Sequence, residues 1–144
     1  MEIERKFLIK SLPDNLEGYE HHSISQGYLS TKPVLRIRKK DDKAFFTYKG
    51  EGLLAREEIE KEIPLETFEH LAPKVDGRLI EKTRYIIPYA GFKIELDVFD
   101  GHKKGLIMAE VEFESIEQAN SFQPPEWFAE DVTSDKSYHN SNMI

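Results

Sequence analysis

The sequence predicts a mainly β (α+β) protein in which about eight antiparallel strands close into a small barrel, with few and short helices. Three observations predict this class. Charged and apolar residues alternate with a period of two in successive segments of the chain. Short turn signals separate these segments, so consecutive strands run antiparallel as a meander. Apolar residues at helical spacing are confined to a few short stretches.

The first segment, MEIERKFLIK, is ambiguous by itself. Glu2 and Lys6 stand at the i, i+4 spacing of a helical ion pair, and Ile3 and Phe7 could belong to a helical apolar stripe. Glu2, Glu4 and Lys6 also share one parity, as on one face of a strand. Because the same alternation returns along the chain, we predict a strand here.

The alternation is clearest in five later segments, which are residues 34–40, 44–50, 56–63, 92–99 and 107–114. Turn signals occur at residues 31–33, 41–42, 50–52, 89–91 and 100–101. We expect Lys39 and Lys40 to belong to the turn that follows the strand containing Arg36 and Arg38. These segments account for most of the predicted barrel.

Three short helices are expected. Pro64 suits the first turn of one that ends at Pro73, because proline is tolerated there and interrupts a helix further on. Ser115 and Gln118 form a capping box that opens a second helix. The tail, residues 132–143, predicts a third helix capped by Thr133 or by Ser134. Because no repeat or linker divides the chain, we predict a single domain over residues 1–144.

Composition limits the classes of protein. The chain has 144 residues, 33% of them charged, a net charge of −7 and no cysteine. Disulfides and thiolate metal sites are excluded, and a broad basic face for nucleic acid is not expected. No segment approaches the ~20 apolar residues of a membrane span, so we expect a soluble, cytoplasmic protein without a membrane or nucleic-acid partner. The oligomeric state stays open, with a homodimer as one option.

The charged residues that alternate with apolar ones could face solvent, as in an ordinary soluble sheet. The signs are sorted along the chain, however, with acids near both ends and bases in the middle, which favours a charged site. If these residues point into the barrel, acids and bases line opposing walls. The acids are Glu2, Glu4, Glu110 and Glu112, and the bases are Lys6, Arg36, Arg38, Lys49, Lys82 and Arg84.

Such an interior suits a cation and a polyanion together. Clustered carboxylates need a neutralising cation, and Mg²⁺ or Mn²⁺ prefers oxygen ligands. Clustered arginine and lysine need an anion, and a polyphosphate offers oxygens that match the arginine fork. The reaction that this arrangement favours is attack of a metal-polarised water on a terminal phosphorus, while the bases hold the chain.

Several motifs in order resemble the CYTH superfamily, also called triphosphate tunnel metalloenzymes. They are EIERK at residues 2–6, QGYL at 26–29, RIR at 36–38, TYKG at 47–50, EKTRY at 81–85, ELDVF at 95–99 and AEVE at 109–112, followed by the tail segments 131–138 and 140–142. The first motif alone is weakly specific. The succession over nearly the whole chain is specific.

The resemblance implies an eight-stranded antiparallel closed barrel that forms a tunnel, with charged side chains inside and apolar residues outside beneath the helices. It implies that Glu2, Glu4, Glu110 and Glu112 bind the catalytic metal, together with Asp97 in preference to Glu95. It also implies that the triphosphate is held by the basic tunnel residues, which are Lys6, Arg36, Arg38, Lys49, Lys82 and Arg84. Lys136 is expected either to close one tunnel mouth or to lie at the surface.

The remaining residues have either an open role or no expected catalytic role. Glu58, Glu60 and Glu62 fit a tunnel wall and a solvent face equally well. The five histidines show no spacing typical of a metal triad or a nucleophile relay, so we expect none to be catalytic. Ser134 and Ser137 are predicted to be helix caps. Trp127 is expected to pack on the barrel exterior.

The compact chain and its motifs most resemble small bacterial inorganic triphosphatases. The expected function is therefore metal-dependent hydrolysis of inorganic triphosphate to phosphate and diphosphate. Two alternatives within the resemblance are an adenylate cyclase of class IV type and a nucleoside or thiamine triphosphatase. A third, from another class, is a polyphosphate-binding sensor without turnover.

Overall fold

The computed structural model describes residues 2–52 and 54–144. The strands within these residues are β1 (Glu2–Ile9), β2 (Glu20–Thr31), β3 (Val34–Lys40), β4 (Lys43–Lys49), β5 (Ala55–Arg56), β6 (Glu58–Ile63), β7 (Asp76–Tyr89), β8 (Phe92–Phe99), β9 (Ile107–Glu112) and β10 (Phe128–Asp131). The α-helices are α1 (Leu65–Leu71) and α2 (Ile116–Ser121). Short 3-10 helices occur at Leu16–Gly18, Ala72–Lys74, Gly101–Lys103, Lys136–Tyr138 and Asn140–Asn142.

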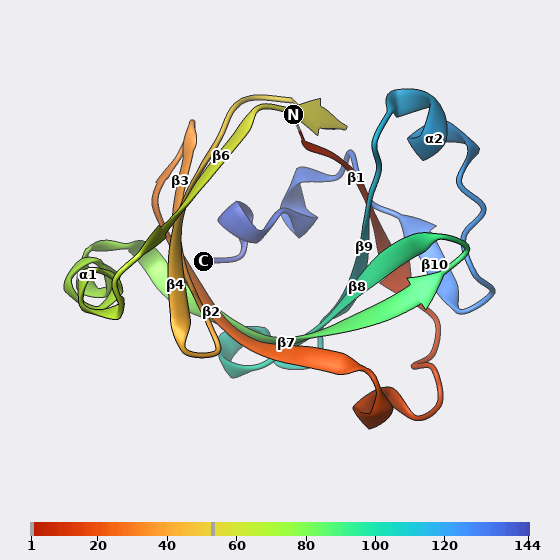
Figure 1. The fold of residues 1–144 in the computed structure, drawn as a ribbon, viewed down its shortest axis with the longest axis horizontal. Coiled ribbons are helices and arrows are strands. Elements are labelled where there is room, and N and C mark those ends of the chain that lie inside the picture. The colour runs from red at the N-terminus through yellow and green to blue at the C-terminus, as the bar shows by residue number, and fades with distance from the viewer. Residues whose placement is uncertain (1, 53) are drawn as a thin grey trace.

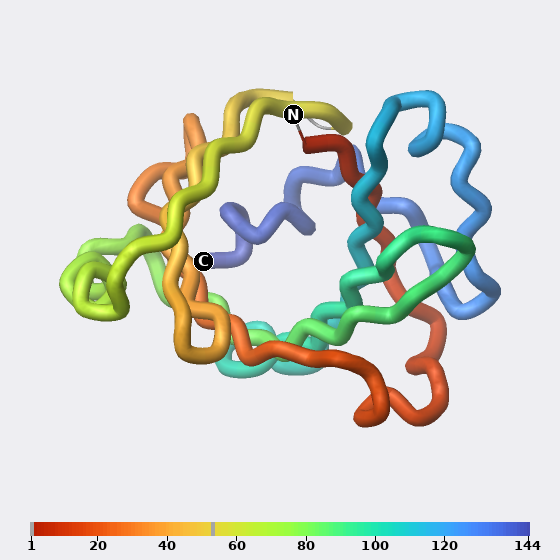
Figure 2. The backbone as a smooth tube through the Cα atoms, in the orientation of Figure 1, coloured from red at the N-terminus to blue at the C-terminus, as the bar shows by residue number. Residues whose placement is uncertain are grey.

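The strands form one antiparallel sheet that curls into a nearly closed barrel (Figures 1 and 2). Nine of them follow the order β10-β1-β9-β8-β7-β2-β3-β4-β6, and β5 pairs with β1. In that pairing Glu2 lies opposite Arg56 and Ile3 lies opposite Ala55, which joins the two sides of the sheet. The predicted antiparallel barrel is confirmed. The strand count differs from eight because the segment 56–63 is divided into β5 and β6, and because β10 adds to β1.

The charged face of the sheet points into the barrel. Nine charged residues of the inner face have less than one tenth of their surface exposed; they are Glu2, Glu4, Lys6, Arg36, Lys49, Lys82, Arg84, Asp97 and Glu110.

 Arg38, which lies on the same inner face, is of intermediate exposure. The apolar face of the sheet points outward, where helices cover it. The prediction that charge lines the interior therefore holds, and the solvent-facing alternative is wrong for these residues.

Two apolar clusters lie between the barrel wall and the outer helices. On one side α2 and the segment after it cover β1 and β9, and the ring of Phe122 lies 6.2 Å from that of Phe7 and 5.3 Å from that of Phe113. Trp127 packs against the same cluster, as predicted. On the opposite side Phe68 of α1 packs against the wall formed by β3 and β4. Burial of these large side chains stabilises the barrel from outside.

The predicted starts of the two α-helices are confirmed. Pro64 immediately precedes α1, and the Ser115 hydroxyl accepts a hydrogen bond of 3.1 Å from the Gln118 amide at the start of α2. In the tail, the predicted cap by Thr133 or Ser134 is wrong. Asp135 caps the 3-10 helix Lys136–Tyr138 by accepting from the Ser137 amide at 3.0 Å.

Thr133 has a different partner because the tail is attached to the first strand. Its hydroxyl oxygen accepts a hydrogen bond of 2.9 Å from the backbone amide of Lys6. Further along, Met143 packs into an apolar cluster with Tyr28 and Val34, and the tail crosses the barrel opening in Figures 1 and 2. The tail therefore covers one end of the barrel.

Among the described residues, no helix combines the length and the apolar character that a membrane crossing requires.

Candidate functional site

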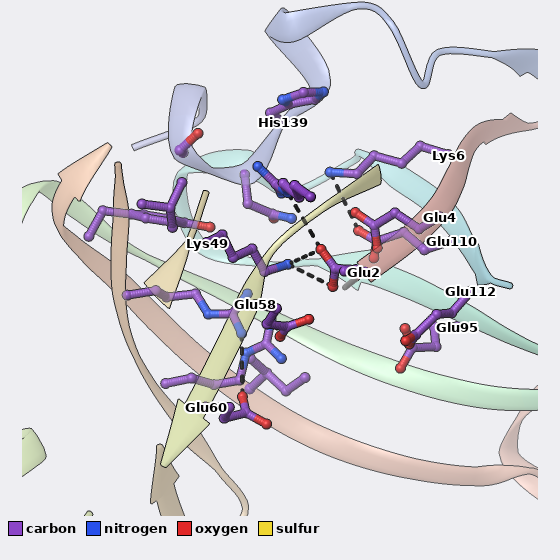
Figure 3. A pocket seen from close by; sticks show the side chains of 18 of the residues that line it. Glu2, Glu4, Lys6, Lys49, Glu58, Glu60, Glu95, Glu110, Glu112 and His139 are labelled. Carbon is purple, nitrogen blue, oxygen red and sulfur yellow. Dashed lines mark hydrogen bonds and ion pairs between the residues drawn. The ribbon is translucent and has the colours of Figure 1, made fainter. Parts of the chain in front are cut away.

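A charged cavity of about 220 Å³ occupies the barrel interior (Figure 3). Its acidic lining residues are Glu2, Glu4, Glu58, Glu60, Glu95, Glu110 and Glu112, and its basic ones are Lys6, Arg36, Arg38, Lys40, Lys49, Arg56 and Arg84. The tail contributes His139, Asn140 and Ser141, and the strands add Ile24, Tyr28 and Val34. Nine of the twelve predicted site residues thus line one cavity, and Asp97, Lys82 and Lys136 do not.

The acids gather on neighbouring strands because of the register. Glu4 of β1 lies opposite Glu112 of β9, and Lys6 lies opposite Glu110. On the other side of β9, Glu110 lies opposite Glu95 of β8. Since residues directly opposite each other in a sheet are about 5 Å apart, the register places these acidic residues close together.

Glu4 is a buried carboxyl group whose pKa is strongly raised. Burial, followed by the charges of Glu110 and Glu2, raises the pKa of Glu4 to about 8. Among the ion pairs of the described residues, none includes Glu4. The pKa of Glu112 is also raised, by burial and by Glu2 and Glu95. These groups lack the positive charge that their ionised forms need.

Glu2 and Glu110 are compensated by bases. The Lys49 ammonium lies 2.9 Å and 3.0 Å from the two carboxylate oxygens of Glu2. Burial would raise the pKa of Glu2, but Lys49 lowers it overall. Lys6 and Arg84 each lie 3.8 Å from Glu110, and they hold its pKa well below the usual range despite its burial.

These acids fit a divalent cation in donor type and charge. Carboxylate oxygens are the ligands that Mg²⁺ and Mn²⁺ prefer, and a cation beside Glu4 would supply the charge that its buried carboxylate lacks. Within residues 2–52 and 54–144, no three Asp, Glu or His side chains are arranged as a metal site. The fit rests on the chemistry of the donors and on the uncompensated burial of Glu4.

The opposing wall carries arginines and lysines that fit an anion. Arg36 donates to Thr47 at 3.1 Å and lies 3.6 Å from Glu60, while its buried Nε has no hydrogen-bond partner among the described residues. Arg38 donates from Nε to Gln26 at 2.8 Å. Burial and the neighbouring cations Arg36 and Arg84 lower the pKa of Arg38 to about 9. A phosphate chain would satisfy these donors and relieve the repulsion among the cations.

Asp97 and Lys82 are buried on the inner face of the sheet but do not line the cavity. The carboxylate of Asp97 accepts hydrogen bonds from Lys82 Nζ at 2.7 Å, from Arg84 Nε at 2.7 Å and from Arg84 Nη2 at 2.9 Å. Burial would raise the pKa of Asp97, and Arg84 and Lys82 lower it. Neither Asp97 nor Lys82 is among the residues that line the cavity, although Arg84 is. Their predicted direct contacts with metal and phosphate stay predictions.

The structure distinguishes residues that the sequence left open. Glu58 and Glu60 line the cavity, and burial and Glu2 raise the pKa of Glu58 to about 7. Glu62 is exposed and is not among the lining residues. Lys136 is also exposed, in a second pocket next to the tail-covered end. A role of Lys136 at this mouth stays a prediction.

Three lining residues with basic side chains, Lys40, Arg56 and His139, were missed. Lys40 is the last residue of β3 and not part of a turn, because the strand continues to the two-residue turn at 41–42. Lys40 follows Arg38 at the same spacing of two residues that separates Arg36 from Arg38, and this spacing could have assigned Lys40 to the inner face. Arg56 shares the parity of Glu58 and lies 3.5 Å from Glu2. His139 reaches the cavity only because the tail folds over the barrel end, and no local pattern indicates this.

Known proteins resemble this chain over nearly its whole length. A model of the CYTH domain family matches residues 1–142. An inorganic triphosphatase of Nitrosomonas europaea is 47% identical over 99% of this chain and 95% of its own length. An inorganic triphosphatase of Acetivibrio thermocellus is 33% identical over 99% of this chain and 92% of its own length.

Among solved structures, a crystal structure of an inorganic triphosphatase superposes with a TM-score of 0.73 at 42% sequence identity, covering 99% of this chain and 93% of the other. The match of the family model over nearly the whole chain and the identity to these relatives lead to one conclusion: this chain belongs to the CYTH domain family.

Proposed function

We propose that the protein hydrolyses inorganic triphosphate to phosphate and diphosphate in a metal-dependent reaction. The observation that carries the proposal is the cavity itself, where buried carboxylates of β1 and β9 face a wall of arginines and lysines. Its volume of about 220 Å³ suits a short phosphate chain and offers little room for an organic group. The two relatives at 47% and 33% identity that are inorganic triphosphatases support the same substrate.

For the metal we propose Mg²⁺ or Mn²⁺, held by Glu2, Glu4, Glu110 and Glu112. When bound, the ion supplies positive charge that polarises phosphoryl oxygens and makes water a better nucleophile. Asp97 suits this role less, since both its oxygens already accept hydrogen bonds from Lys82 and Arg84. We propose that Asp97 acts by holding Arg84 in place at the cavity wall.

The bases bind and orient the substrate. Arg36 and Arg38 present guanidinium groups from one strand, and each can donate two parallel hydrogen bonds to phosphate oxygens. Lys6 and Arg84 lie beside Glu110, each 3.8 Å from its carboxylate. A water oxygen forms the new bond to the terminal phosphorus while the bond to the bridging oxygen breaks. The fixed positive charges stabilise the diphosphate that leaves.

A substrate panel tests the proposal. The protein is incubated with tripolyphosphate, ATP and thiamine triphosphate, each with Mg²⁺ and with Mn²⁺, and phosphate, diphosphate and cyclic AMP are quantified. We expect the highest kcat/KM with tripolyphosphate and products of phosphate and diphosphate. Cyclic AMP from ATP would establish a cyclase instead. Tight binding of tripolyphosphate without phosphate release in either metal would establish a sensor.

A further inference from the structure

Gln26 of β2 is a buried polar residue that the proposed mechanism does not use. Its side chain has 0% exposure and is not among the residues that line the cavity. Gln26 lies directly opposite Arg38 in the β2–β3 pairing. Its amide oxygen accepts a hydrogen bond of 2.8 Å from Arg38 Nε, and its amide nitrogen donates to the Tyr28 hydroxyl at 3.3 Å. Both ends of the amide are thereby fixed.

This contact orients the guanidinium of Arg38. Because Gln26 uses the Nε–H, the two terminal amino groups of Arg38 remain for a ligand in the cavity that Arg38 lines. Tyr28, which holds the other end of the amide, is itself a buried residue with 3% exposure. A rigid chain from Tyr28 through Gln26 to Arg38 therefore sets the direction of the arginine fork.

Gln26 also differs in charge from the partners of the other cavity arginines. A carboxylate oxygen lies 3.6 Å from Arg36, 3.5 Å from Arg56 and 2.7 Å from Arg84. Among the ion pairs of the described residues, no carboxylate partners Arg38. Arg38 is held by a neutral acceptor and keeps a full positive charge for a ligand.

We propose that Gln26 is a positioning residue for the phosphate chain, which fixes the fork of Arg38 without neutralising it. This inference rests on the proposed function. A glutamate would occupy nearly the same volume and accept the same hydrogen bond, but its charge would compete with the phosphate for Arg38. The amide therefore selects for an anionic ligand. Burial, followed by the neighbouring cations Arg36 and Arg84, lowers the pKa of Arg38 to about 9, so a phosphate would relieve repulsion at this position.

Substitutions at position 26 separate orientation from charge. Gln26→Glu keeps the shape and the acceptor and adds a charge, whereas Gln26→Met keeps the approximate length and removes the acceptor. The readouts are the Kd of tripolyphosphate, measured by calorimetry in chelator-treated buffer, and KM and kcat in Mg²⁺. We expect Gln26→Glu to raise Kd and KM by about tenfold or more, and Gln26→Met to raise them by a smaller factor, because only Gln26→Glu opposes the charge of Arg38.

Two controls make the result specific. Ser25→Glu adds the same charge one residue away, on the other face of β2, and should change Kd by less than about twofold at moderate salt. In an Arg38→Lys background the Nε–H is absent, so Gln26→Met should add little further loss. Thermal unfolding of each variant checks that it is folded.

Three results would overturn the inference: parental affinity in Gln26→Glu, an equal loss in Ser25→Glu, or additive effects of Gln26→Met and Arg38→Lys. In these cases the parental protein still hydrolyses tripolyphosphate, so the proposed function stands. Absence of tripolyphosphate binding and turnover in the parental protein would remove the proposed function and this inference together.

Discussion

Glu4→Gln should stabilise the metal-free protein in a pH-dependent manner while it abolishes turnover. Glu4 is 8% exposed, and its pKa is raised from 4.5 to about 8 by burial and by Glu110 and Glu2. In the folded protein the carboxyl group keeps its proton over a pH range in which the unfolded chain has lost it. The folded state then binds more protons, so the contribution of Glu4 to stability falls as pH rises from 4.5 to about 8.

The magnitude follows from the shift. One pKa unit corresponds to about 1.4 kcal/mol, so a rise from 4.5 to about 8 corresponds to at most about 5 kcal/mol. Glutamine has the same shape as the protonated carboxyl group and does not ionise. The free energy of unfolding of Glu4→Gln relative to the parent should therefore be near zero at pH 4.5 and increase with pH, reaching its plateau above pH 8.

The assay is urea unfolding of both proteins in chelator at several pH values between about 4 and about 9, a range that extends beyond both ends of the titration from 4.5 to about 8. Glu69→Gln, which changes an exposed carboxylate of α1, is the matched control and should show no pH-dependent difference. Added Mg²⁺ should stabilise the parent and have less effect on Glu4→Gln. A difference between Glu4→Gln and the parent that does not change with pH would refute the assignment of Glu4 as an uncompensated buried acid.

Three further substitutions test other parts of the site. Glu112→Ala should lower kcat by at least about a hundredfold, measured by steady-state kinetics at saturating Mg²⁺, and a near-parental kcat would contradict its role. Its free energy of unfolding, measured in urea, should equal or exceed that of the parent, because burial and neighbouring acids raise the pKa of Glu112. Arg38→Lys should lower kcat/KM about tenfold, since lysine keeps the charge but cannot donate two parallel hydrogen bonds to a phosphate. Lys39→Ala, on the exposed face of β3, should leave kcat/KM nearly unchanged, and equal losses in the two variants would indicate diffuse electrostatic attraction of the substrate instead. Asp97→Asn should lower the free energy of unfolding by about 3–5 kcal/mol, because it leaves Lys82 buried without its counter-charge. A loss of activity in a protein of parental stability would instead favour direct metal binding by Asp97.

The alternation of the sequence determined which residues share a face. A period of two is a local property of an extended backbone, so Glu2, Glu4 and Lys6 could be assigned to one side of a strand from the order of residues alone. The same reasoning placed Arg36 and Arg38 together. That the charged side lies inside was favoured by the sorting of the charges, and burial in the structure confirms it.

Only the tertiary structure decided which groups meet across the barrel. The pairing of β5 with β1 brings Arg56 to Glu2, and the folded tail brings His139 to the cavity. Such contacts depend on the register and closure of strands that are distant in the sequence, and a local period carries no information about them. For the same reason the pattern could place Asp97 on the inner face but could not show that Lys82 and Arg84 already neutralise its carboxylate.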